Sequence, residues 1–136
     1  MNMKKYIFGT LTFIIVTFIV QATSHFIINQ EHYESISFIR KEVIFPLGFL
    51  TMTLQGIVLS FLFNLYSNGQ FNIKKGLYFG LIISALFVSY PTFTEPAKYQ
   101  VTNIGHWIIV EGTVGLIQFC TYGILISLIF KKIKKS

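Results

Sequence analysis

Four long apolar stretches, separated by short polar segments, dominate the pattern of this chain. They cover residues 6–28, 43–66, 71–91 and 104–130. Each has about the 20 residues that a helix needs to cross the hydrocarbon core of a bilayer, and none alternates apolar and polar positions as a barrel strand does. The pattern therefore predicts an all-α integral membrane protein: an antiparallel four-helix bundle that forms a single membrane domain, residues 1–136.

The lysines indicate how the bundle lies in the membrane. Eight of them precede the first stretch, lie where the third stretch begins after the second, or follow the fourth: Lys4, Lys5, Lys74, Lys75, Lys131, Lys132, Lys134 and Lys135. If all four stretches cross, these eight lie on one side, and the other side keeps only Arg40, Lys41 and Lys98. The positive-inside rule then places both termini in the cytoplasm, and we expect a bacterial inner (plasma) membrane.

The composition agrees with this class. Mean hydropathy is +0.64, and 12% of the residues are charged, about half the share of an ordinary soluble domain. The formal net charge of +6 does not point to nucleic acid, because the cations flank the apolar stretches instead of covering one soluble face. The expected partner is the lipid bilayer.

Prolines, a turn sequence and a candidate cleavage site indicate where helices begin and end. Pro91 and Pro96 predict the end of the third helix. Ser-Asn-Gly at residues 67–69 predicts a turn, so the second and third helices are expected to lie side by side. Residues 1–22 also resemble a cleavable signal peptide, but the apolar stretch resumes beyond Ala22, which favours an uncut span. Both interpretations stay open.

Two similarities suggest an internal repeat. Residues 4–9 resemble residues 74–80, and residues 56–63 resemble residues 123–130. The two halves would then be tandem helical hairpins related by a parallel repeat. Chance is the competing explanation, because membrane helices draw on a small alphabet.

The third stretch carries small residues at every fourth position: Gly76, Gly80 and Ser84. This spacing lets helix backbones approach closely. It predicts packing either inside the bundle or between the copies of a homo-oligomer.

Polar side chains inside hydrocarbon are costly, so the few present are expected to face the bundle interior. They gather toward the extracytoplasmic side, and we expect six of them to line a ligand pocket open to that side: Gln21, His25, Gln55, His106, Glu111 and Gln118. His106 and Glu111 would anchor a polar head, and the glutamines would orient it. An interhelical hydrogen bond is the alternative role of Gln55 and Gln118.

Several site classes lack the residues that they need. There is no aspartate, no GxSxG motif and no Gly-rich phosphate loop, so no catalytic residue is assigned. The single cysteine, Cys120, excludes a Cys-x-x-Cys redox pair. The histidines lack an HxxxH or HExxH spacing, so neither a metal nor a cofactor is expected.

Four segments together carry a resemblance to other proteins: residues 45–59, residues 75–81, the pair Ala97-Lys98, and Glu111 followed by Gln118-Phe119. In these segments the chain resembles a group of small four-span bacterial inner-membrane proteins with no assigned activity. The resemblance implies the fold and the location, and no reaction. The chain does not resemble the small multidrug exporters, whose essential acid lies in the first span, because residues 6–28 hold no acid.

The sequence favours a binding or accessory membrane protein for a lipid-like or amphipathic ligand, and leans away from an enzyme. Three alternatives stay open. Glu111 and His106 could form the acid–base pair of a membrane-embedded enzyme acting on lipid. The chain could instead be a small proton-coupled transporter, or a purely structural subunit.

Overall fold

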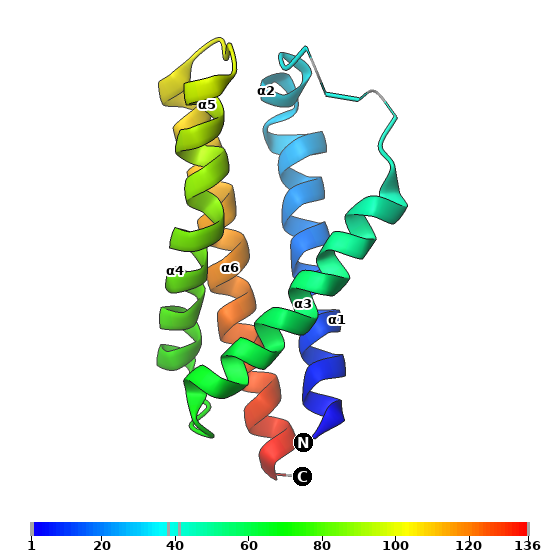
Figure 1. The fold of residues 1–136 in the computed structure, drawn as a ribbon, viewed down its shortest axis with the longest axis vertical. Helices are drawn as coiled ribbons and strands as arrows, with labels where there is room; N and C mark the ends of the chain where they lie inside the picture. Colours follow the sequence, from blue (N-terminus) through cyan, green and yellow to red (C-terminus); the bar gives the residue numbers. More distant parts are fainter. Residues whose placement is uncertain (1, 38, 41, 136) are drawn as a thin grey trace.

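The computed structural model describes residues 2–37, 39–40 and 42–135. In chain order the elements are α1 (Met3–Thr23), the π-helical turn η1 (Ser24–Ile28), α2 (Gln30–Glu34), α3 (Phe45–Ser67), α4 (Ile73–Ser89), the π-helical turn η2 (Tyr90–Thr94), α5 (Glu95–Lys98) and α6 (Ile104–Lys135). The described residues contain no strand. The predicted all-α bundle is confirmed (Figure 1).

Four continuous helical segments are long and apolar enough to cross a membrane: Met3–Ile28, Phe45–Ser67, Ile73–Lys98 and Ile104–Lys135. They agree with the predicted stretches within a few residues, except that the third helix extends further. Large apolar side chains point outward along them, as at Leu86, which is 67% exposed, and Ile109, which is 66% exposed. A surface of this kind suits hydrocarbon better than water.

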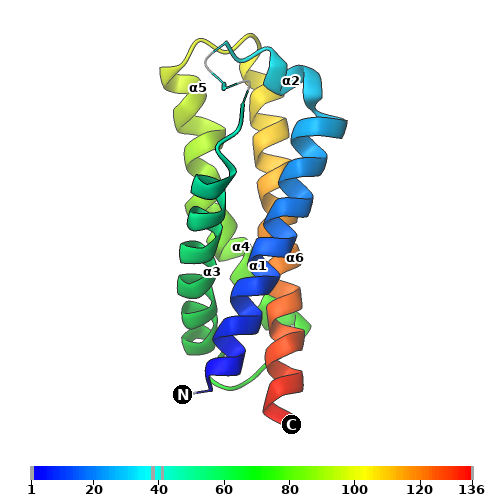
Figure 2. The same cartoon turned by 90° about the vertical axis from the view of Figure 1, so that its right-hand side faces the viewer.

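The two ends of the bundle differ. Both termini lie at one end, called here the terminal end, and α2 and α5 lie at the other, called the cap end (Figures 1 and 2). Helix α4 packs along α6, and α1 packs against both α3 and α6. Helix α3 crosses obliquely and meets α4 only near the turn that joins them. The expectation that α3 and α4 lie side by side therefore holds only near the turn, because their tilts separate them beyond it.

The predicted stripe of small residues packs α4 against α6 of the same chain. Gly76 and Gly80 are buried, and a Cβ atom at Gly80 would lie 2.6 Å from the carbonyl oxygen of Phe119. Ser84 is also buried, and its hydroxyl donates to the Gly80 carbonyl at 2.8 Å. These three residues thus pack against α6 or lie buried within the same chain. The homo-oligomer stays a prediction.

The prediction that the two prolines end the third helix is met in part: the regular α-helix α4 ends at Ser89, just before Pro91, but the helical segment does not end there. The chain continues through Pro91 and Pro96 to Lys98, because the wider turn η2 accommodates the prolines. Glu95 donates its N–H to the Tyr90 carbonyl, five residues back. The Pro91 carbonyl would need the N–H of Pro96, which has none, and it accepts instead from Trp107 Nε1 at 2.8 Å.

A ligand groove and the polar network beside it

A short chain of side-chain hydrogen bonds joins α1 to α6 near the middle of the bundle. Gln21 Nε2 donates to Gln118 Oε1 at 2.6 Å, and Gln118 Nε2 donates to Thr17 Oγ1 at 3.0 Å. Gln118 is 5% exposed, so both of its amide atoms are paired out of contact with lipid. For Gln118 the structure shows the interhelical hydrogen bond that was the alternative to a pocket role.

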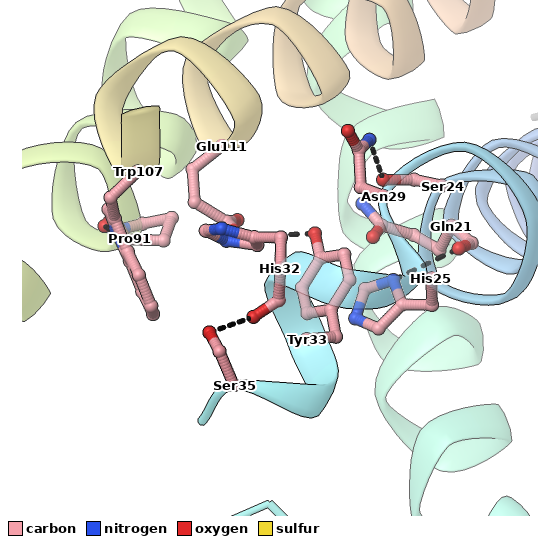
Figure 3. A network of polar contacts seen from close by, with 10 residues as sticks. All are labelled: Gln21, Ser24, His25, Asn29, His32, Tyr33, Ser35, Pro91, Trp107 and Glu111. Atoms are coloured by element: carbon pink, nitrogen blue, oxygen red, sulfur yellow. Dashed lines mark hydrogen bonds and ion pairs between the residues drawn. The ribbon is translucent and has the colours of Figure 1, made fainter. Parts of the chain in front are cut away.

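Nearer the cap end, Glu111 of α6 meets the helix α2. Tyr33 donates its hydroxyl to Glu111 Oε1 at 3.0 Å, and His32 Nε2 lies 3.5 Å from the same oxygen. Figure 3 shows Tyr33 between the Glu111 carboxylate and the His25 ring. The rings of Tyr33 and His25 stack with centroids 3.5 Å apart. The cluster therefore holds α2 and η1 against α6.

The two residues from α2 are buried, and burial shifts their titration. The His32 side chain is 6% exposed, and its pKa is lowered from 6.5, first by burial and then by the nearby His106. Burial and the negative charge of Glu111 raise the pKa of Tyr33. His32 is therefore neutral at neutral pH, and Tyr33 keeps the proton that it donates to Glu111.

His106 meets this network at the His32 ring. Its side chain is exposed, and its ring centroid is 5.4 Å from that of His32. His106, His32 and Trp107 line a cap cavity of about 240 Å³ between α2 and the segment that precedes α6. No group of three or more histidine, cysteine or acidic side chains in the described part of the chain is placed to hold a metal ion.

A larger groove lies between the cap halves of α1 and α3. It has a volume of about 600 Å³, and Phe18 and Phe49, which stack with centroids 6.0 Å apart, belong to its mainly apolar lining. Gln21, His25 and Gln55 also line it. Gly48 contributes open space, because a Cβ atom there would meet nothing within 4 Å.

At its cap end the groove continues into a second space of about 580 Å³, called here the vestibule. The two spaces share five lining residues: His25, Phe26, Ile39, Arg40 and Val43. The vestibule adds polar groups from α2 and the segment after it, among them Gln30, Glu34 and Ser37. A continuous path thus leads from an apolar groove to a polar mouth.

The structure places the six predicted residues in three different surroundings. Gln21, His25 and Gln55 line the groove, and His106 lines the cap cavity. Glu111 and Gln118 belong to the hydrogen-bond network between the helices. Sequence reasoning missed three contributors, His32, Tyr33 and Arg40. Their polar character was visible, but nothing in their spacing showed which helix they would meet.

Four apolar helices with lipid-compatible surfaces define the class: this is a multi-pass helical membrane protein. Comparison with protein-family models, curated proteins and solved structures finds no match. The site must therefore be interpreted from its own geometry.

Proposed function

We propose that this protein is a small accessory membrane protein that holds a lipid-like, amphipathic molecule in the groove between α1 and α3. The observation that carries the proposal is the groove itself, about 600 Å³, within the range of about 300–1,000 Å³ typical of small-molecule sites. Its apolar lining and its place beside lipid-exposed helices suit an acyl chain. Arg40 at the mouth suits a polar head.

Gln55 supports a ligand with a polar group partway along its length. Its amide lines the groove and makes no hydrogen bond with the described residues. An amide left unpaired in an apolar environment is costly, and an ester or hydroxyl group of a bound lipid would pair with it. Gln21 and His25 would contact the ligand nearer the mouth.

His25 is oriented for such a contact. Its Nδ1 lies 3.0 Å from the Gln21 carbonyl oxygen, and a carbonyl can only accept, so Nδ1 carries the proton. In the neutral ring Nε2 is then free to accept from a ligand. Glu111, Gln118 and His106 would act indirectly, by fixing the elements around the groove.

The lysine distribution supports an orientation as part of the same proposal. The terminal end would face the cytoplasm of a bacterial inner membrane, since Lys4, Lys5, Lys74 and Lys75 and the lysines after residue 130 all belong to that end. The groove and its vestibule would then open in the extracytoplasmic half of the bilayer.

A membrane-embedded enzyme fits less well. Glu111 has a histidine neighbour, but it is His32 and not the predicted His106. Neither Glu111 nor His32 lines the groove or the vestibule. The pair is therefore placed to hold α2 on α6, not to meet a substrate in the groove.

The variant Gly48→Leu tests the proposal, because it places a side chain in the open groove without touching any neighbouring atom at Cβ. The matched control is Val58→Leu, on the same helix at a lipid-exposed position outside the groove. Native mass spectrometry after extraction in mild detergent should show a co-purified lipid on the wild type and on Val58→Leu, and none on Gly48→Leu. Equal lipid on all three proteins would refute the groove as a binding site.

A further inference from the structure

The vestibule carries two opposite charges that are not paired with each other. Glu34, at the end of α2, and Arg40, in the segment that leads to α3, both line it. Within the described residues, the one contact of 4.0 Å or less between a basic and an acidic side chain is that of His32 with Glu111. Glu34 and Arg40 therefore border the same space without forming an ion pair with each other.

The carboxylate is held in place. Gln30 Nε2 donates to Glu34 Oε1 at 2.6 Å, four residues away on α2. This hydrogen bond uses Oε1 and leaves Oε2 available to accept from a ligand. The guanidinium of Arg40 is exposed, and its planar set of donors suits a phosphate.

The two charges lie where the head of a groove-bound lipid must be. Arg40 lines both the groove and the vestibule, whereas Glu34 lines only the vestibule. A phosphate on the glycerol that carries the acyl chains would reach Arg40 first. A positive group attached beyond that phosphate would reach Glu34.

We infer that the occupant of the groove is a zwitterionic, aminated phospholipid, with its phosphate at Arg40 and its ammonium group at Glu34. This inference rests on the proposed function and adds the class of head group. A purely anionic head could still place its phosphate at Arg40, but it would offer no cation to the Glu34 carboxylate. The zwitterion satisfies both charges at once.

The test is a competition between phosphatidylethanolamine and phosphatidylglycerol with identical acyl chains, offered in equal amounts to the detergent-purified protein. Native mass spectrometry gives the ratio of the two bound lipids. Because exposed charge pairs are weak, we expect the wild type to prefer phosphatidylethanolamine by about two- to fivefold. Glu34→Gln keeps an oxygen that can accept from Gln30, and it should bring the ratio close to equality without abolishing binding.

The matched control is Glu42→Gln, which removes one negative charge from the same connecting segment at an exposed position outside both cavities. It should leave the wild-type preference intact. Arg40→Gln should weaken the binding of both lipids. A wild type that binds phosphatidylglycerol equally or better, or equal effects of Glu34→Gln and Glu42→Gln, would overturn the inference about the head group.

The failure of the broader proposal would look different. If Gly48→Leu retains both lipids as the wild type does, the groove is not the binding site, and the head-group inference fails with it. If Gly48→Leu loses both lipids while the wild type shows no preference, the groove is a lipid site and only the zwitterionic assignment is wrong.

Discussion

The two helix pairs α1–α3 and α4–α6 begin alike at the terminal end. In each pair a glycine of the first helix packs against a serine of the second. A Cβ atom at Gly9 would lie 3.0 Å from Ser60 Cβ, and one at Gly76 would lie 2.9 Å from Ser127 Cβ. Ser60 and Ser127 are corresponding positions of the repeat suggested by the sequence. Both pairs therefore approach closely through a glycine and a serine, and the serines match in the repeat, whereas Gly9 aligns with Gly80 and not with Gly76.

The pairs differ at the cap end. Gly48 and Gly115 also correspond, since each stands eight residues before the glycine that begins its repeat segment. Gly115 packs directly against Val88, whereas a Cβ atom at Gly48 would meet nothing within 4 Å. One pair stays closed along its length, and the other opens into the groove. Small residues thus permit close packing, but the tilt of α3 decides whether it occurs.

The largest effect expected is the contrast between Gly115→Leu and Gly48→Leu. A leucine at 115 collides with Val88, and overpacking of this kind costs about 1–3 kcal/mol. At Gly48 the added side chain enters open space, so the stability of the lipid-free protein should be unchanged or slightly raised. Thermal unfolding in detergent measures both. Similar losses at the two positions would show that the groove is closed in solution.

A second contrast concerns the two mid-helix glutamines, Gln118 and Gln55. Gln118→Leu leaves Thr17 and Gln21 without their partner, at a cost of about 0.6–1.7 kcal/mol as measured for hydrogen bonds between membrane helices. Gln55→Leu removes an amide that has no partner among the described residues, so it should not reduce stability. It should, however, weaken retention of the co-purified lipid. A stability loss at Gln55 as large as that at Gln118 would contradict this distinction.

The contact of α2 with α6 at the cap end should depend on pH through His32. Its pKa in the folded protein lies below 6.5, so in acid the unfolded chain takes up a proton that the folded protein still excludes. The stabilisation is complete above pH 6.5 and is lost as the pH falls toward the lower folded value. The melting temperature should therefore decrease on acidification.

The variant His32→Gln isolates this contribution. It removes the titrating ring while Tyr33 keeps its hydrogen bond to Glu111. The melting temperature of the variant should change less than that of the wild type between about pH 8 and about pH 5. Identical pH profiles for the two proteins would assign the effect to other groups.

The features set by the membrane could be predicted from the sequence, because each span must satisfy its own backbone and expose apolar side chains. The small-residue stripe on α4 followed from the same logic. The end of the α-helix α4 before Pro91 could be predicted, but its continuation through η2 could not, because the proline rule assumes α-helical hydrogen bonding and η2 does not follow it.

The grouping of the site residues depended on information that the sequence does not carry. Gln55 and Gln118 look equivalent in sequence, yet one faces the groove and the other bonds to α1. The rotation of each helix decides this, and packing against its neighbours sets that rotation. His32 and Tyr33 lie in a connecting segment without periodicity, so their contact with Glu111 emerged only when α2 was placed over α6.

The smallest substitution effect expected belongs to the closed half of the molecule, at Trp107→Phe. The aromatic ring remains to pack beside His32, whose ring centroid lies 5.0 Å away, but the donor to the Pro91 carbonyl is lost. No backbone N–H can replace it, because Glu95 donates to Tyr90 and Pro96 has no N–H. The loss should be about 0.5–1 kcal/mol, and thermal unfolding in detergent would detect it. Because the α4–α6 pair is closely packed, we expect lipid retention in the groove to be unaffected. A loss of lipid would show that the α4–α6 pair is coupled to the α1–α3 pair through the cap end.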